Sequence, residues 1–321
     1  MRIAASVLLL AASAMGHAYA ASADFSSVPI SEQNIALSKM VAQSQVDASK
    51  ESAEKTIKDI CDLGGFKCIK ADVDVATHSV NNEVKYNAEA LSKLSPDVRR
   101  FIILHEHGHN NQYHNPNSEK IQNAADKWER SLSNISLRKN FSDSIAQLNF
   151  KQIDSRSDFT DEEKSLLKEY RDDSHNDEYK ADRAAVHQSF CLAVINKKLD
   201  PNQIYRTAEE ALITGSILIY QNAISNPEDY KSLVLQSVND QFETIDHPNI
   251  SNRLNAISDT VQLLSDRYKS GEKVCAQNPV MEFAPFEPRD TINFLAARAD
   301  RLKATDRSPG MSTSSPGMSP S

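Results

Sequence analysis

The chain has 321 residues, a formal net charge of −8 and no dense block of lysine and arginine. Nucleic acid and anionic membrane surfaces are bound through concentrated basic patches, so this composition argues against both as the main partner. The length allows two modest domains or one large domain with insertions.

The N-terminus predicts a secretory signal peptide. Arg2 precedes an apolar or small run at residues 3–15, and Ala-Tyr-Ala follows at 18–20. This order is typical of a cleaved signal, so we expect residues 1–20 to be removed. The run is short for a membrane span, which needs about 20 residues, and no transmembrane segment is expected in the mature chain. The protein is therefore predicted to be exported, to the periplasm or alternatively as a secreted protein.

Apolar residues recur every three or four positions along most of the chain, which predicts helices. The expected helices lie at about 31–60, 95–112, 118–150, 161–172, 176–197, 201–224, 227–238, 249–269 and 288–304. Alternating apolar residues predict two short strands, at about 69–76 and 83–87. The tail at 305–321 is rich in Ser, Pro, Gly and Met and is predicted to be disordered. The predicted fold class is α+β and mostly α, with a small sheet surrounded by helices.

Four cysteines follow the predicted signal peptide: Cys61, Cys68, Cys191 and Cys275. An even number in an exported chain predicts two disulfides, for which three pairings exist. We favour Cys61–Cys68, because Asp62 to Gly65 can turn the chain back, which leaves Cys191–Cys275 as a long-range bond. No C-x-x-C pair is present, so a zinc site made of these cysteines is the weaker interpretation.

The helix predicted from residue 95 has a clear start signal. Ser95 is the expected N-cap, Pro96 takes the first helical position, and Asp97 faces the positive helix end. We expect this helix to run to about Gln112 and to stop near Pro116.

Within this helix, the stretch from His105 to His109 fits the pattern H-E-x-x-H. Residues four apart lie on the same helical face, so His105 and His109 can bind one Zn²⁺ ion together. Zinc lowers the pKa of a bound water to about 7, and Glu106 is placed to act as the general base. His107 and His114 do not share this face and are expected to be ordinary polar residues.

Two histidines leave zinc without a third protein ligand. A metzincin would need a glycine and a histidine where the chain has Gln112 and Asn115, so that class is rejected. Glu178 and Asp182, four apart on a later helix, offer a ligand and an outer hydrogen-bond acceptor for a ligand histidine. The alternative is a solvated acidic face. Rival ligands by proximity are Asp173, His175 and Asp177.

Three motifs in this order resemble the HtpX and CAAX-prenyl-protease type of zinc metalloendopeptidase. The residues that carry the resemblance are His105 to His109, then Glu178, Ala181, Asp182 and Ala185, then His247, Pro248, Arg253 and Ile257. The resemblance covers about 69–260 and implies a gluzincin with a zincin-like core in a domain at 21–304. Because the transmembrane helices of the membrane-bound members are missing, it points to the soluble, exported branch.

The resemblance also implies roles. His105, His109 and Glu178 would bind zinc, Glu106 would be general base and acid, and Asp182 would lie behind a ligand. His247 would stand at the open side of the metal, as an oxyanion stabiliser or a fourth ligand. Arg253 would brace its helix through a carboxylate such as Asp182, and Glu83–Asn87 would be the edge strand that pairs with substrate.

The function expected is zinc-dependent cleavage of exposed or unfolded polypeptides in an exported compartment, with envelope proteins as further partners. The alternative is a metal-stabilised, chaperone-like or binding protein whose zinc site is occluded and inactive. A third interpretation is a structural helical protein in which the motif is fortuitous.

Overall fold

The computed structural model of the chain describes residues 52–79, 82–109, 119–133, 148–223, 227–239 and 241–275. These residues all belong to one unit of the chain, Phe25–Pro288. The predicted signal peptide, the predicted helix at 288–304, the predicted tail and His114 lie outside the described residues, as do most of 31–60 and residues 134–147 of the helix predicted at 118–150.

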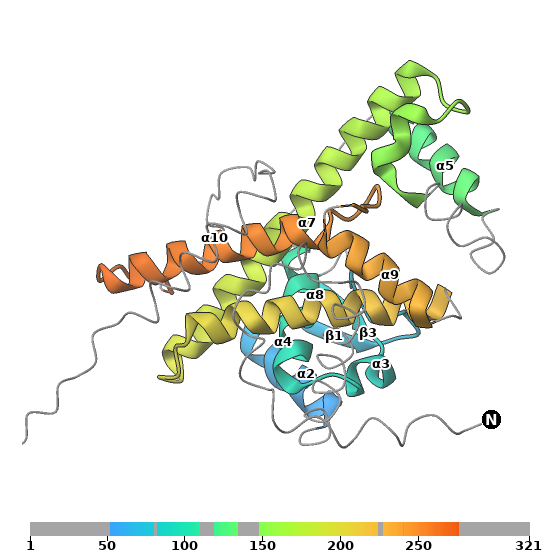
Figure 1. Cartoon of the computed structure of the whole chain (residues 1–321). Helices are drawn as coiled ribbons and strands as arrows, with labels where there is room; N and C mark the ends of the chain where they lie inside the picture. Colours follow the sequence, from blue (N-terminus) through green and yellow to red (C-terminus); the bar gives the residue numbers. More distant parts are fainter. Residues whose placement is uncertain are drawn as a thin grey trace, which may run out of the picture. The chain divides into compact units, whose positions relative to one another are not determined.

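Helices make up most of the described chain, and a small sheet accompanies them (Figure 1). This confirms the predicted mostly helical α+β class. The helices are α2 (Ala53–Gly64), α3 (Ala88–Ser92), α4 (Pro96–His109), α5 (Glu119–Ser133), the 3-10 helix η2 (Phe150–Ser155), α7 (Asp161–Ile195), α8 (Pro201–Ala223), α9 (Pro227–Val238) and α10 (Ile250–Lys269). Among the described residues, no helix combines the length and apolar character that a membrane span requires.

The sheet has three short strands in the order β1 (Lys67–Lys70), β3 (Glu83–Tyr86), β2 (Ala76–Ser79). β3 pairs in parallel with β1 and antiparallel with β2. The prediction that Glu83–Asn87 forms an edge strand is therefore wrong, because β3 is central and its Val84 is fully buried.

The strand predicted over residues 69–76 is also wrong, because the chain bends at 72–75 between β1 and β2. Asn87 holds this bend: its side-chain amide donates to the Val73 carbonyl at 2.8 Å, and its backbone N–H donates to the Val75 carbonyl at 2.8 Å. These contacts keep the bend out of the strand ladder, although its residues alternate as a strand would.

α4 begins as the sequence predicts. Pro96 is its first residue, and the Ser95 hydroxyl accepts a hydrogen bond from the Val98 N–H at 3.4 Å. Behind this start, the buried Arg99 donates from Nε to the carbonyls of Leu91 and Leu94, each at 2.9 Å. These two hydrogen bonds hold the turn between α3 and α4 against α4.

α7 differs from the prediction, because the two helices expected at 161–172 and 176–197 form one continuous helix of 35 residues. Its N-terminus is a capping box, in which Thr160 and Glu163 each accept a hydrogen bond from the other's backbone N–H. The predicted break falls at 173–175, within the run from Asp172 to Asp177, whose residues are poor helix formers.

The two larger buried apolar clusters among the described residues both support α7. The larger one joins α2, the sheet, α4, α8, α10 and the C-terminal half of α7. The smaller one, here called the Trp128 cluster, joins α5, η2 and the N-terminal half of α7, and consists of Ala124, Trp128, Phe150, Ile153, Phe159, Leu167 and Ile245. Ile245 is the one member of this set that lies close to α10: it belongs to the segment that leads into that helix.

The predicted disulfides are both present. Cys61 is bonded to Cys68 across seven positions, and Cys191 is bonded to Cys275 across 84 positions. The second bond ties the last turn of α7 to the segment after α10.

Candidate metal centre

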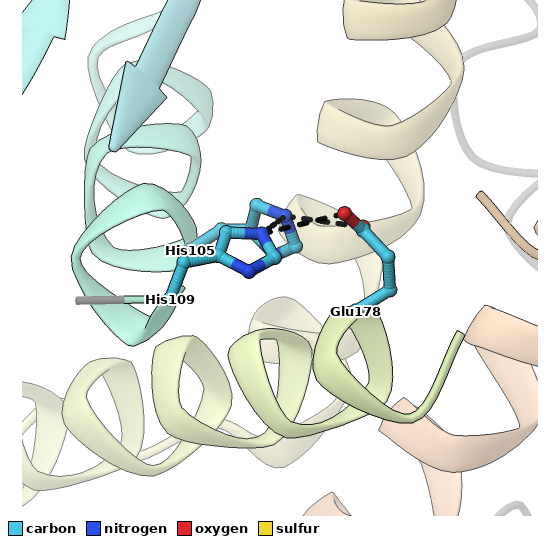
Figure 2. A group of neighbouring side chains, drawn as sticks. All are labelled: His105, His109 and Glu178. Atoms are coloured by element: carbon cyan, nitrogen blue, oxygen red, sulfur yellow. Dashed lines mark hydrogen bonds and ion pairs between the residues drawn. The ribbon is translucent and has the colours of Figure 1, made fainter. Parts of the chain in front are cut away.

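α4 and α7 cross at very short range, and this crossing brings the predicted ligands together. A Cβ atom added to Gly108 would lie 2.8 Å from Ala181 Cα and 3.0 Å from its carbonyl oxygen. Only a glycine on α4 therefore lets the two backbones approach this closely. The crossing places His105 and His109 of α4 opposite Glu178 of α7 (Figure 2).

The three candidate ligand side chains form a compact triangle of donor atoms. His105 Nε2 lies 3.2 Å from His109 Nε2 and 3.4 Å from Glu178 Oε2, and His109 Nε2 lies 3.3 Å from Glu178 Oε1. Tetrahedral ligands at about 2.0–2.1 Å from a zinc ion would lie about 3.4 Å apart. The donor set therefore fits a metal ion of this size.

The three candidate ligand residues are buried. Within the described part of the chain Glu178 Oε2 accepts no well-directed hydrogen bond, and the Arg253 guanidinium lies beside it, with Nη1 3.1 Å away. Arg253 therefore balances part of the negative charge of Glu178, and the fit of a metal rests on the geometry and chemistry of the three donor groups. The chemistry of two imidazoles and one carboxylate is that of a His₂Glu site.

Each ligand imidazole is held from behind by a carboxylate. Asp182 Oδ1 lies 3.0 Å from His105 Nδ1, and Asp177 Oδ2 lies 2.6 Å from His109 Nδ1. Both rings therefore donate outward from Nδ1 and turn Nε2 inward. Asp182 lies where the sequence places it. Asp177, considered only as a rival ligand, is instead the outer partner of His109.

Arg253 makes the contact that the resemblance implies. Its guanidinium donates from Nε and Nη2 to the two carboxylate oxygens of Asp182, both at 2.8 Å. The same side chain reaches Glu178 through Nη1, so α10 is tied to two acidic residues of α7. A forked pair of this kind fixes geometry as well as charge.

The charges in the pocket favour a cation. Burial lowers the pKa of His109, but the hydrogen bonds that its ring donates to Asp177 and Glu178, together with the charges of Glu178 and Glu106, outweigh burial and raise that pKa to about 11. Burial raises the pKa of Glu178, yet the charges of His247 and Arg253 hold it well below its usual range. The carboxylates thus stay ionised and stabilise positive charge between the imidazoles.

The two residues predicted to act on substrate lie beside the triangle. Glu106 is half-buried on α4, next to His105, and its charge contributes to the raised pKa of His109 after those of Asp177 and Glu178. His247 stands on the solvent side, with 57% of its side chain exposed and Nε2 3.5 Å from Glu178 Oε1.

Two other histidines of the region face away from the triangle. His175 is buried and its Nε2 lies 3.0 Å from the Thr244 carbonyl oxygen, which it can reach as a donor. His107 packs against Phe66 with ring centroids 4.0 Å apart, and burial lowers its pKa. Neither joins the donor set.

Comparisons of the chain with protein-family models, with curated proteins and with solved structures gave no match.

Proposed function

We propose that the protein is a zinc-dependent endopeptidase of the HtpX and CAAX-prenyl-protease type with a zincin-like core. The observation that carries the proposal is the buried triangle of His105, His109 and Glu178, in which both imidazoles have a carboxylate behind them. Glu106, next to His105 on α4, supplies the general base that such a site needs for hydrolysis.

A zinc ion at this site would supply Lewis acidity and lower the pKa of a water ligand to about 7. Glu106 accepts a proton from the attacking water and returns it to the leaving nitrogen, so that the amide bond gives a carboxylate and an amine. His247, on the solvent side of Glu178, is placed to stabilise the negative charge that develops on the carbonyl oxygen.

An extended polypeptide fits beside the sheet. β2 is an edge of the sheet and packs against α4, the helix that carries the motif. Edge strands bind extended peptides through main-chain hydrogen bonds, which suits a substrate that is exposed or unfolded. We assign substrate pairing to β2 for this reason.

The two disulfides support an exported location, because such bonds persist in oxidising compartments. We place the protein in the periplasm or, alternatively, outside the cell, where envelope proteins would be its partners.

The test compares wild type with Glu106→Gln, using metal analysis of the pure protein and cleavage of a labelled unfolded polypeptide. We expect both proteins to contain one zinc ion per chain, and cleavage by the variant to fall about 100-fold or more. Cleavage that resists chelators, or that survives in Glu106→Gln, would contradict the proposal. If the wild-type protein binds no zinc, the remaining interpretation is a structural helical protein in which the motif is fortuitous.

One observation favours a second function, a metal-stabilised binding protein with an occluded site. His247 Nε2 lies within 3.5 Å of a ligand oxygen, so this imidazole is close enough to block the open side. This function requires bound zinc without cleavage, both in wild type and in His247→Ala. Cleavage by either protein rules it out.

A further inference from the structure

The segment at residues 241–248, here called the His247 segment, joins α9 to α10 without forming a helix or strand. Phe242, Glu243 and Ile245 are nevertheless buried. A segment with no regular hydrogen-bond ladder needs other contacts to hold one conformation. Those contacts come from α7 and from the residues around η2.

α7 contributes three side chains. His175 Nε2 reaches the Thr244 carbonyl at 3.0 Å, Arg171 Nη1 lies 3.4 Å from Glu243 Oε1, and the Tyr170 hydroxyl donates to Asp246 Oδ1 at 3.2 Å. Only the first of these donors is buried, so it is the least exposed to competition from water.

Asn149 and Phe150 hold the beginning of the segment. The Asn149 amide donates to the Gln241 carbonyl at 2.7 Å and accepts from the Glu243 N–H at 3.3 Å, and the Phe150 N–H donates to the Glu243 carbonyl at 2.9 Å. Ile245 packs in the Trp128 cluster. The segment is thus anchored before it reaches His247.

The last link lies inside the segment. The Thr244 N–H donates to the His247 carbonyl at 3.1 Å, and the Thr244 hydroxyl accepts from the His247 N–H at 3.0 Å. These two bonds make Thr244 and His247 one unit. A group that holds the Thr244 carbonyl therefore also holds the backbone of His247.

His175 lies one turn before Glu178 on α7, so anchor and ligand share a helical face. We propose that His175 is a positioning residue, which binds the Thr244 carbonyl and thereby keeps His247 at the open side of the metal site. This role rests on the proposed metal site. It assigns to His175 a task distinct from metal binding.

The test uses His175→Leu, which removes the donor, and His175→Gln, which keeps an N–H near the position of Nε2. Lys168→Gln is the matched control, because Lys168 lies on the same helix and pairs with Asp154, away from the His247 segment. Amide hydrogen exchange over residues 241–248 is measured together with kcat and KM for an unfolded polypeptide.

In His175→Leu we expect exchange over the His247 segment to be at least 10-fold faster, and kcat to fall to the value of His247→Ala. The double variant His175→Leu with His247→Ala should have the same kcat as His247→Ala alone, because both changes remove the same function. His175→Gln and Lys168→Gln should resemble wild type. Wild-type exchange in His175→Leu, or losses that multiply in the double variant, would overturn the positioning role.

Thr244→Val tests the same chain of contacts without disturbing a buried side chain. It removes the hydroxyl that holds the His247 N–H, and we expect kcat to fall at least 10-fold with KM nearly unchanged. An unchanged kcat would overturn the proposal. If wild type binds zinc and cleaves the polypeptide, and His175→Leu and Thr244→Val match it, only the positioning role is wrong. If wild type binds no zinc or does not cleave, the proposed function and the positioning role are overturned together.

Discussion

The carboxylates behind the imidazoles of His105 and His109 decide which nitrogen each ring turns towards the proposed metal site. Asp182 contacts His105 Nδ1, and Asp177 contacts His109 Nδ1, so Nε2 is the inward atom of both rings. Such outer partners orient a ligand and increase its basicity. Asp177 is the simpler of the two to test, because Asp182 also pairs with Arg253.

We expect Asp177→Asn to weaken zinc binding about 10- to 100-fold, since the amide can no longer support His109 as a charged acceptor. Competition with a chromophoric chelator measures the affinity. Glu169→Gln is the control, because Glu169 is an exposed acid on the same helix. Equal zinc affinities for Asp177→Asn and Glu169→Gln would contradict the role given to Asp177.

We expect His175 to make the metal-free protein sensitive to acid. Burial lowers the pKa of His175 to about 4, so the folded protein keeps this ring neutral where the unfolded chain binds a proton. The stability that it contributes is complete above about pH 6.5 and is lost as the pH falls towards 4. The shift corresponds to about 3 kcal/mol in the free energy of unfolding.

We expect His175→Gln to reduce this loss, because glutamine can donate to the Thr244 carbonyl but does not titrate. Urea unfolding of chelator-treated protein between pH 7 and 4 measures the effect. The free energy of unfolding should fall less steeply in the variant than in wild type. Parallel curves for the two proteins would show that His175 does not remain neutral in the fold.

At the scale of elements, the crossing of α4 and α7 depends on the absence of a side chain at Gly108. A methyl group there would meet the backbone of Ala181, which cannot move without moving α7. Gly215 of α8 offers a contrast, because a methyl group there would meet only Ile102 Cδ1, at 4.0 Å.

We expect Gly108→Ala to lower the free energy of unfolding by about 1–3 kcal/mol and to weaken zinc binding, because the helices must separate. Gly215→Ala should instead stabilise by about 0.5–1 kcal/mol, as alanine usually does in a helix. Denaturant unfolding and zinc titration of both variants test this. Normal stability and affinity in Gly108→Ala would show that the crossing is looser than described.

Much of this arrangement could be predicted from the sequence, because its signals are local. The spacing of His105 and His109 places them on one face, and Pro96 marks the start of their helix. The pairing of Cys61 with Cys68 likewise follows from a short turn between them. Each of these predictions needs only neighbouring residues.

What could not be predicted depends on contacts between distant residues. The order of strands in the sheet is set by long-range packing, so neither β2 nor the central position of β3 could be read from alternation. Asp177 and Glu178 are adjacent, and which of them faces the inward nitrogens of His105 and His109 depends on how α7 is rotated against α4. His175 acts on a carbonyl 69 positions away, which no local pattern indicates.

At the scale of the whole molecule, the two disulfides close loops of very different length. Cys61–Cys68 closes a short loop beside the sheet, whereas Cys191–Cys275 spans 84 positions and encloses α8, α9 and α10. A crosslink restricts the unfolded chain more when the loop is longer.

We expect the paired change Cys191→Ser with Cys275→Ser to cost about 4–5 kcal/mol, and Cys61→Ser with Cys68→Ser about 2 kcal/mol. Denaturant unfolding of the two double variants under the same conditions gives the comparison. A larger loss from the short loop than from the long one would show that native contacts around Cys61, rather than chain entropy, dominate.

The continuity of α7 has a consequence for how metal and fold depend on each other. Asp172 to Asp177 would cost an isolated helix about 3 kcal/mol relative to alanine, and the acidic residues repel one another. Glu178, the proposed metal ligand, follows Asp177 directly. If Glu178 binds a cation as proposed, that cation ties this unfavourable stretch of α7 to α4, so removal of the metal should loosen α7 first near its middle rather than at its ends.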